Sequence, residues 1–417
     1  MMNDKRLRVC VCTSLAAAQE PRAPRHAAAI AALGTGVEVV FVDSAPAGAG
    51  RQPVKALEGF PNLAWQTHYF TTRTGNPVRL AGERIWQRLA QVLYRFGGPM
   101  VPAALSTRAI GLECMLRATA ADIYLAHNIE TLLPAFRAAQ SQGALVMFDS
   151  MEFHSDMGDS QTAVERAIVR SVEKKCLPGC ALLLASSTQV ADALAAEYGL
   201  SCPLPLDNAP LIEKELPPKS DKGLQLYWRN AVVGLGQRGL DEALLALTKL
   251  PVDVTLHLQG RMPVDGGAAL RARIAELKLE DRVIFHPPYL PEDAVRVAAR
   301  HHVGLCLERK ANRNHELTTS NKIFDYHMAG LAVIASDLPG LHGVIERSGG
   351  GLLFAPGVVN DLTAKIQMLY RDTPLRAQLA GKARAFALSE GNRENEMKKF
   401  AAAFADVCRA RLGVAFN

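Results

Sequence analysis

The sequence predicts an α/β protein with two domains, each built on a doubly wound parallel sheet. Short apolar runs that end in polar residues alternate with helix-forming stretches, as in successive βαβ units. At 417 residues the chain is long for one hydrophobic core and fits two domains of ordinary size. A proline-rich stretch separates the two series, so we expect a first domain at 1–205, a linker at 206–222, a second domain at 223–385 and a terminal helical segment at 386–417.

The composition is that of a globular protein, with 49% hydrophobic and 21% charged residues, which excludes a disordered chain. The net charge of +6 is mild. Its excess is concentrated between positions 51 and 120, where nine basic residues accompany three acidic ones. We expect no nucleic-acid partner.

The amino-terminal apolar stretch 9–18 predicts a first strand and not a signal peptide, because Thr13 and Ser14 interrupt it. No apolar run reaches the roughly 18 to 20 residues that a membrane span requires. The eight cysteines form no CxxC pair, which favours reduced thiols and a cytoplasmic location.

The first domain opens with a predicted strand at 8–12, a helix within 16–33 and a strand at 37–42. This βαβ unit lacks the GxGxxG fingerprint, so it is no evidence for a dinucleotide. Arg22 and Arg25 lie at the start of the helix. They are either surface charge or contacts to an acceptor or a phosphate, since ligands of open α/β sheets bind beyond the strand ends.

Two later strands of this domain, at 122–126 and 144–148, end in ionisable residues on the same side of the sheet. His127 follows the first strand, and Asp149 and Glu152 follow the second. His127 is the better candidate for chemistry, although a single histidine is more often structural. The Asp-x-x-Glu spacing is not a DxD metal motif, so no metal site is expected.

Residues 80–96 predict an amphipathic helix with a basic flank made by Arg84, Arg88 and Arg95. Its apolar residues Ile85, Leu89, Val92, Leu93 and Phe96 fall on one face. Such a helix either lies on anionic lipid, as a peripheral membrane contact within 79–96, or packs that face against the core and exposes the basic flank.

The second domain begins with a predicted strand at 224–228, followed by Arg229 and the glycine-rich loop 234–239. Glycines let a backbone approach phosphate, and Arg238 precedes a helix there. A later loop, 287–290, carries Tyr289 after the predicted strand 282–286.

The stretch 315–340 carries the strongest signal. Thr318 to Ser320 offer caps for a helix over 322–329 that ends at Gly330, and a strand at 332–336 leads into a turn at 337–340. Lys322 and Asp325 share one face of that helix. They form a solvated ion pair, or else Lys322 binds an anion at the helix start and Asp325 accepts the hydroxyls of a ribose.

Residues 321–340, NKIFDYHMAGLAVIASDLPG, resemble the carboxyl-terminal signature of retaining, nucleotide-sugar-dependent glycosyltransferases of the GT-B fold, family four. The Gln-Arg-Gly-Leu run at 237–240 is similar to the basic-Gly pair of that family. The strand followed by His127 and a helix, and the later Asp-x-x-Glu segment, resemble the amino-terminal half of these glycosyltransferases. The resemblance implies two Rossmann-like domains that face a cleft, with a terminal helix that crosses back to the first domain.

The resemblance also implies roles for residues of this chain. Asp325 stands where the family has an acid, usually Glu, on the ribose, while Arg238 and Lys322 neutralise the donor diphosphate and His127 lies near the transferred sugar. Many members carry a second Glu eight positions before the first acid, where this chain has Leu317, and Glu316 is the adjacent substitute. The candidate donor-binding residues are Arg238, Lys322, Asp325, Ser320, Asn321, Thr319, Glu316, Arg229 and Tyr289. The acceptor-side candidates are Thr13, Ser14, Arg22 and Glu152.

The function implied is metal-independent transfer, with retention, from a UDP- or GDP-linked sugar to a glycan or lipid-linked acceptor, without a further cofactor. Two alternatives stay open. A nucleotide-sugar epimerase of the same fold converts the donor without an acceptor, and a non-catalytic relative binds carbohydrate or a partner. Leu317 favours the second alternative.

Overall fold

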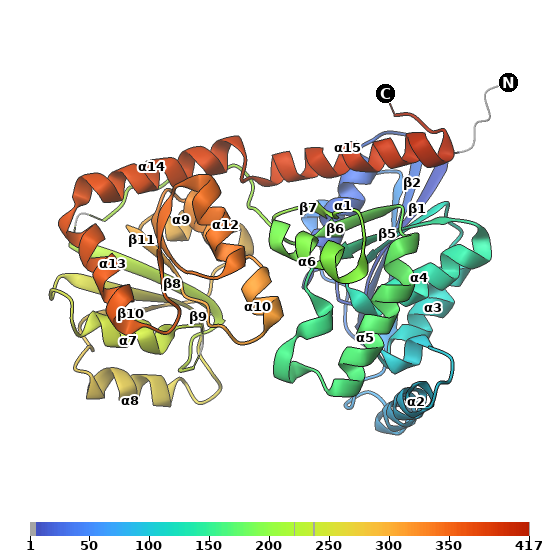
Figure 1. Ribbon diagram of the computed structural model, residues 1–417, viewed down its shortest axis with the longest axis horizontal. Helices are drawn as coiled ribbons and strands as arrows, with labels where there is room; N and C mark the ends of the chain where they lie inside the picture. Colours follow the sequence, from blue (N-terminus) through green and yellow to red (C-terminus); the bar gives the residue numbers. More distant parts are fainter. Residues whose placement is uncertain (1–5, 221, 237, 417) are drawn as a thin grey trace. The chain divides into compact units, whose positions relative to one another are not determined.

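The computed structural model describes residues 6–220, 222–236 and 238–416. The chain divides into two compact units, which we call unit 1 (Met1–Leu206 with Met397–Asn417) and unit 2 (Asp207–Glu396). Each unit is a parallel sheet with helices on its faces (Figure 1), as the alternation of strands and helices predicts.

Unit 1 holds a seven-stranded parallel sheet in the order β3-β2-β1-β4-β5-β6-β7. Its strands are β1 (Leu7–Thr13), β2 (Val37–Pro46), β3 (Leu63–Phe70), β4 (Ile123–His127), β5 (Leu145–Ser150), β6 (Leu182–Ala185) and β7 (Leu204–Pro205). Its helices are α1 (Arg22–Ala31), α2 (Pro77–Arg95), α3 (Ala109–Ala118), α4 (Ile129–Gln142), α5 (Ala163–Cys176) and α6 (Thr188–Tyr198). The direction of winding reverses between β1 and β4.

Unit 2 holds a six-stranded parallel sheet in the order β10-β9-β8-β11-β12-β13. Its strands are β8 (Leu224–Val232), β9 (Val254–Arg261), β10 (Val283–His286), β11 (Val303–Cys306), β12 (Ala332–Ser336) and β13 (Gly351–Phe354). Its helices are α7 (Leu240–Leu247), α8 (Ala268–Glu276), α9 (Ala294–Ala298), α10 (Arg313–Leu317), α11 (Lys322–Met328), α12 (Pro339–Ser348), α13 (Val359–Arg371) and α14 (Thr373–Ser389). Here the winding reverses between β8 and β11.

Both faces of the unit 2 sheet are covered, because successive side chains of a strand point to opposite faces. Leu226 and Trp228 of β8 belong to the core on one face. Tyr227, between them, belongs to the core on the other face, together with residues of α9 and α11. This two-sided burial explains why the strands read as near-continuous apolar runs.

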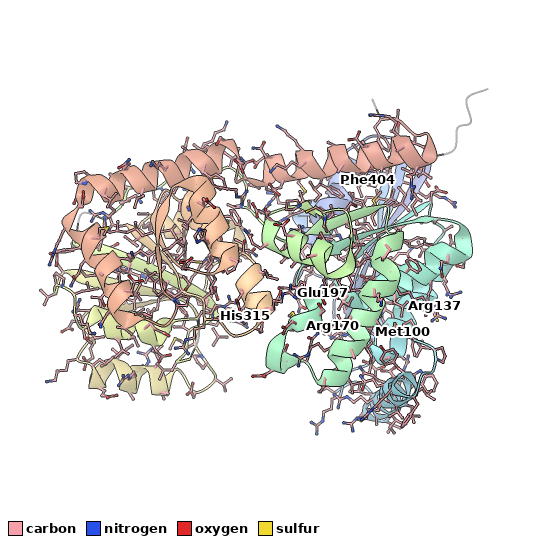
Figure 2. The ribbon with its side chains drawn as sticks, viewed as in Figure 1. Met100, Arg137, Arg170, Glu197, His315 and Phe404 are labelled. Carbon is pink, nitrogen blue, oxygen red and sulfur yellow. The ribbon has the colours of Figure 1, made fainter. Side chains whose placement is uncertain are left out.

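The last helix, α15 (Arg393–Leu412), completes the core of unit 1. Phe400, Phe404 and Cys408 are spaced four residues apart, so they share one face of the helix, and all three are fully buried in that core. Phe404 is labelled in Figure 2 on the side of α15 that faces the sheet. The carboxyl-terminal residues are therefore part of the amino-terminal fold.

Two local predictions around residue 320 are wrong. The cap position of α11 is Asn321, in a helical conformation without a side-chain cap hydrogen bond, so Thr318 to Ser320 do not cap it. The predicted turn at 337–340 is the start of α12, where Pro339 occupies the first helical position, which suits its fixed φ. Gly330 has the predicted left-handed conformation (φ +66°) after α11.

The eight cysteines are all free thiols. Within the described residues, no helix is both long and apolar enough to span a membrane.

Candidate functional site

The polar residues predicted for unit 2 gather where its sheet reverses direction, at the carboxyl ends of β8 and β11. Arg229 lies near the end of β8, and Glu308 follows β11 by two residues. In open α/β sheets a crevice forms at this position because the two neighbouring loops run to opposite sides. We call six residues gathered here the switch-point cluster: Arg229, Arg238, Tyr289, Glu308, Lys322 and Asp325.

Arg229 connects two of the predicted residues. Its guanidinium forms an ion pair with the carboxylate of Asp325 on α11, and it donates a hydrogen bond of 2.8 Å to the hydroxyl of Tyr289. Burial lowers the pKa of Arg229, but Asp325 and the surrounding tyrosines outweigh it and hold that pKa above its usual value. The guanidinium therefore stays charged.

Glu308 connects the other two. Its carboxylate accepts a hydrogen bond of 2.5 Å from Arg238, and the ammonium of Lys322 lies 3.4 Å from its other oxygen. Its backbone is fixed as well, because Ser336 on the neighbouring strand donates to its carbonyl at 2.7 Å and accepts from its amide at 2.9 Å. Sequence reasoning missed Glu308, although it lies just beyond the carboxyl end of a strand, as the other candidates of this sheet do.

Burial and neighbouring charges shift the pKa values of Glu308 and Lys322 in opposite directions. Burial raises the pKa of Glu308, but Lys322 and Arg238 together bring it below the usual value. Burial lowers the pKa of Lys322, and Glu308 offsets part of that effect. Arg229, Arg238 and Lys322 together outnumber the carboxylates of Glu308 and Asp325, so the cluster suits an anionic ligand.

The loop before α7 holds Arg238 in a conformation that side chains rarely adopt (φ +38°). The indole of Trp228 donates a hydrogen bond of 3.0 Å to the backbone carbonyl of Arg238. Gly239 follows with φ +69°, and a Cβ there would lie 2.5 Å from Leu307. Gln237, in the same predicted loop, lies outside the described residues.

The remaining predicted donor residues lie around the start of α11. Asn321 precedes the helix, and the Thr319 hydroxyl donates to the carbonyl of Gly340 at 3.0 Å. Ser320 is close enough to Glu308 to help lower the pKa of that carboxyl. Glu316 instead forms a 3.2 Å ion pair with Lys310, so its carboxylate is engaged away from the cluster.

Unit 1 has a second group of polar residues at its own point of reversal, between β1 and β4. The hydroxyl of Ser14 donates to the side-chain carbonyl of Asn128 at 2.9 Å, and the Asn128 amide donates to Thr13 at 3.3 Å. Asn128 has φ +61° and ψ 160°, a region used almost only by glycine. Strain held by neighbouring hydrogen bonds is a property of functional loops.

His127 lies beneath this loop and not on its surface. Its ring has no exposed surface, and its Nδ1 lies 3.3 Å from the carboxylate of Asp149. That His127 lies near the transferred sugar stays a prediction, and the enclosed ring exposes no atom for a direct contact. The neighbouring histidine, His26, stacks on Phe400 with 4.1 Å between the ring centres.

Arg22 is the internal counter-ion of Asp149, so the surface interpretation is wrong. Its Nε and Nη2 bond the two carboxylate oxygens at 2.5 and 3.0 Å, and its Nη1 donates to the carbonyl of Leu206 at 2.7 Å. Burial raises the pKa of Asp149, but Arg22 and then His127 lower it far more. Arg22 is only 4% exposed, which also argues against an acceptor contact.

Glu152, the other acceptor-side candidate, lies in the loop after β5 and is half-buried. Its backbone carbonyl accepts a hydrogen bond of 2.9 Å from Ser150 at the end of that strand.

Helix α2 packs its polar face inward and turns its apolar face outward. Gln87 and Gln91 donate to the backbone carbonyls of Leu105 and Ala104 at 3.3 and 3.1 Å. The residues of the apolar stripe are exposed instead, from 49% for Leu89 to 83% for Phe96. They are Ile85, Leu89, Val92, Leu93 and Phe96. The core-facing interpretation of this helix is therefore wrong.

A cavity of about 620 Å³ lies between α2 and the start of α5. Three arginines line it, together with glutamines of α2 and residues of α5. Its lining residues are Arg84, Gln87, Arg88, Gln91, Val92, Arg95, Thr162, Val164 and Glu165.

One family model matches part of the sequence, within unit 2. Residues 233–372 match the family model described as glycosyl transferases group 1. This segment contains Arg238, Glu308, Lys322 and Asp325 of the switch-point cluster. No curated protein matches the sequence.

Solved structures match over nearly the whole chain. The Anabaena protein Alr3699/HepE in complex with UDP is 15% identical, with a TM-score of 0.67, covering 96% of this chain and 100% of that one. Sucrose-phosphate synthase from Thermosynechococcus elongatus is 15% identical, with a TM-score of 0.68 and coverages of 97% and 100%. A glycosyltransferase from Rickettsia africae is 14% identical, with a TM-score of 0.65 and coverages of 97% and 99%. The fold is GT-B, with two Rossmann-like units.

Proposed function

We propose that this protein transfers a sugar, with retention of configuration, from a nucleotide diphosphate sugar to a glycan or lipid-linked acceptor. The observation that carries the proposal is the switch-point cluster of unit 2. Four of its charged residues, Arg238, Glu308, Lys322 and Asp325, lie inside the segment that matches the glycosyltransferase family model. The UDP and UDP-glucose complexes of the Anabaena protein make UDP-sugars the first donors to test.

In this proposal the donor diphosphate binds Arg238 and Lys322. Both cations already lie at Glu308, at 2.5 and 3.4 Å, so they are positioned before the donor arrives. The ribose hydroxyls donate to Asp325, whose carboxylate is held by Arg229, and the base lies near Tyr289. Thr319, Ser320 and Asn321 supply further polar groups beside the helix start.

Catalysis is then mainly electrostatic. As the bond between the sugar and the diphosphate breaks, negative charge grows on the leaving phosphate, and fixed cations stabilise it more than they stabilise the bound donor. The acceptor hydroxyl attacks from the side of the leaving group and gives its proton to a donor phosphate oxygen. These steps require no divalent ion, so transfer should proceed without added Mg²⁺ or Mn²⁺.

His127 acts as a positioning residue and does not contact the substrate, because its ring is buried. It lies between Asp149 and the strained Asn128 loop, where Thr13 and Ser14 offer hydroxyl groups. These polar groups of unit 1 are the proposed acceptor-side contacts.

We place the acceptor at a membrane surface. The exposed apolar stripe of α2 is larger than the scattered apolar residues of an ordinary surface, and arginines flank it. A helix of this kind binds anionic lipid by burying its apolar face at the headgroup level.

The donor assignment is tested by titrating UDP and GDP into wild type, Arg238→Ala and Asp325→Ala in a calorimeter. Loss of one charged hydrogen bond, about 1.5–3 kcal/mol, should weaken the preferred nucleotide about 10- to 100-fold. Arg273→Ala, which removes a surface arginine of α8 paired with Glu276, is the matched control. Unchanged affinity in both cluster variants contradicts the assignment.

Turnover separates the proposal from its alternatives. An activity assay with UDP-sugars should detect a transferred sugar only when an acceptor is present. The product should retain the anomeric configuration of the donor. A new nucleotide sugar formed from donor alone indicates an epimerase, and nucleotide binding without any turnover indicates a non-catalytic relative.

A further inference from the structure

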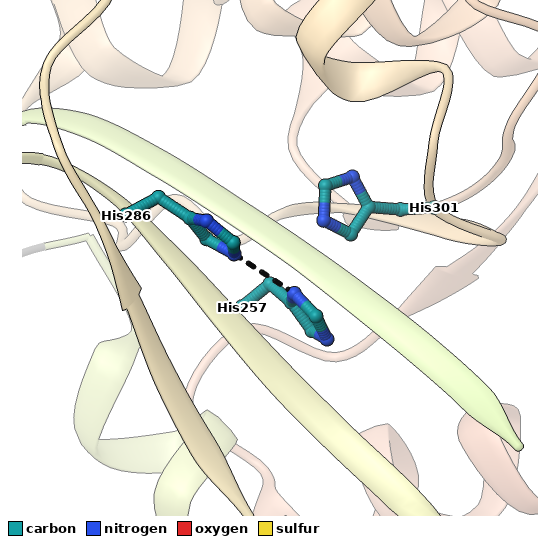
Figure 3. A group of neighbouring side chains, drawn as sticks. All are labelled: His257, His286 and His301. Carbon is teal, nitrogen blue, oxygen red and sulfur yellow. Dashed lines mark hydrogen bonds between the residues drawn. The ribbon is translucent and has the colours of Figure 1, made fainter. Parts of the chain in front are cut away.

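Three histidines of unit 2 converge at one edge of its sheet, although they are far apart in the sequence. His257 lies on β9, His286 is the last residue of β10, and His301 lies in the bend before β11. One nitrogen of each ring lies within 4.8 Å of the others. Figure 3 shows the rings of His257 and His286 joined by a hydrogen bond, with His301 beside them.

The hydrogen bonds leave suitable nitrogens facing this point. His301 Nδ1 lies 3.1 Å from the carbonyl oxygen of Ala298, which can only accept, so Nδ1 carries the proton and Nε2 keeps its lone pair. His257 Nδ1 and His286 Nε2 are 2.9 Å apart and share one proton. A metal between them would replace this proton, which the outer nitrogen of the same ring can carry; His257 Nε2, for example, lies 3.1 Å from the Thr255 hydroxyl. An imidazole held through its other nitrogen by a backbone carbonyl is the usual arrangement of a metal ligand.

The protonation state also fits. Burial, followed by the neighbouring histidines, lowers the pKa of His257 to about 3, and burial lowers that of His301 to about 4. Burial lowers the pKa of His286 as well. All three rings are therefore neutral at neutral pH, which is the form that binds a metal.

We propose that His257, His286 and His301 bind one divalent transition metal ion, with zinc foremost. The ligands are His257 Nδ1, His286 Nε2 and His301 Nε2, and because His286 is half-buried, a water can supply the fourth. Neutral imidazoles without carboxylates select such ions over Mg²⁺ and Ca²⁺. Zinc bonds of about 2.0–2.1 Å place the ligand nitrogens roughly 3.4 Å apart. Small rotations of the rings would therefore separate the His257 and His286 nitrogens, now 2.9 Å apart, and bring His301 Nε2 closer to both.

A second group of similar spacing, His26, His127 and Asp149, provides a useful contrast. The guanidinium of Arg22 already bonds both oxygens of Asp149, and all three residues are fully buried. A cation there would meet a fixed positive charge in an enclosed site. The proposal is therefore confined to the cluster in unit 2.

The metal would fasten the edge strand β10 to β9 and to the bend before β11. His286 is three residues from Tyr289, whose hydroxyl binds Arg229 of the switch-point cluster. The ion would thus order the loop that carries Tyr289, without touching the reacting groups. This makes the three histidines positioning residues.

The test uses full-length protein freed of its affinity tag and stripped of metal with a chelator. Titration with Co²⁺ should give one ion per chain, with the strong visible absorption of a four- or five-coordinate site, and Zn²⁺ should displace it. Zn²⁺ should also raise the melting temperature, because it binds only the folded state. Weak absorption typical of octahedral Co²⁺, or no binding, overturns the proposal.

His286→Gln and His257→Gln should abolish the absorption and the rise in melting temperature. His342→Gln is the matched control, since His342 is a surface histidine of α12 that contacts Asp337 at 2.8 Å outside the cluster. Circular dichroism of the metal-free variants shows whether each is folded, and half-buried His286 is the substitution that the fold tolerates better. Wild-type Co²⁺ binding in folded His286→Gln contradicts the site.

Discussion

Buried charge in unit 1 depends on a few fully enclosed residues. Asp149 is bonded by Arg22 and approached by His127 and His26, and none of these residues is more than 4% exposed. A charge in such a place is tolerated only while its partner is present. The stability of unit 1 should therefore be sensitive to this carboxylate.

Asp149→Asn should destabilise the protein by about 3–5 kcal/mol, because it leaves the Arg22 guanidinium buried without a counter-ion. The measurement is the free energy of unfolding in urea at pH 7. Asp406→Asn, which removes an exposed ion pair with Arg409, should cost less than about 1 kcal/mol. Equal effects in the two variants contradict the buried-pair interpretation.

Glu173 gives a pH-dependent prediction. Burial raises its pKa from 4.5 to about 7, although Tyr198 donates a hydrogen bond of 2.6 Å to it. The folded state holds this proton more tightly than the unfolded state, so wild type loses stability as pH rises from about 4.5 through 7.

Glu173→Gln removes that loss. At pH 8 the variant should be more stable than wild type by up to about 3 kcal/mol, since one pKa unit corresponds to about 1.36 kcal/mol. At pH 4 the difference should disappear. Urea unfolding at both pH values measures it, with the exposed Glu276→Gln as control; a variant that is less stable than wild type at pH 8 contradicts the prediction.

At the level of elements, the sequence patterns predicted the strand bounds and helix ends that depend on local backbone chemistry. The run 332–336 is strand β12 to the residue, and Gly330 ends α11 with a positive φ. The caps at Thr318 to Ser320 were not predictable, because tertiary packing decided which residue begins the helix. Gly340 is an example: a Cβ there would lie 2.4 Å from the Thr318 carbonyl, so α12 is packed directly against that loop.

The sequence also did not predict which face of α2 packs inward. The amphipathic pattern was correct, but the pattern alone does not say which face packs inward. The inward face is set by hydrogen bonds to backbone groups distant in the sequence, such as those that Gln87 and Gln91 donate. Convergence of His257, His286 and His301 also depends on strand register and has no motif spacing.

Helix α2 should bind vesicles that contain anionic lipid. Replacing Leu89 and Val92 by Ser, or Arg84 and Arg88 by Gln, should reduce co-sedimentation with such vesicles, each arginine contributing about 1 kcal/mol or roughly fivefold. High salt should weaken binding of wild type more than that of the arginine variant. Arg273→Gln is the control, and vesicle binding that survives both double substitutions contradicts the proposed contact.

At the scale of the whole molecule, the two sheets reverse direction at central strands, and the candidate residues collect there in both units. The rule for open α/β sheets made this predictable for Arg229 and His127, since Arg229 lies near the end of β8 and His127 ends β4. The burial of Arg22 and His127 was not predictable, because it depends on the terminal helix: Phe400 of α15 covers His26 beside them.

Phe404→Ala should lower the stability of unit 1 by about 3–5 kcal/mol, because it opens a cavity in a fully packed core. Differential scanning calorimetry should show an earlier transition for unit 1, while the transition of unit 2 and nucleotide affinity stay unchanged. Leu412→Ala, at an exposed position of the same helix, should cost less than about 1 kcal/mol. A uniform shift of all transitions contradicts independent cores.

The position of α15 in the chain sets an order of assembly during synthesis. A ribosome releases all of 207–396 before Phe400, Phe404 and Cys408 emerge, so the later-encoded unit is complete while the earlier one still lacks part of its interior. The amino-terminal sheet therefore keeps apolar surface uncovered until α15 emerges. Nascent chains of this protein are therefore most in need of chaperones in their first half.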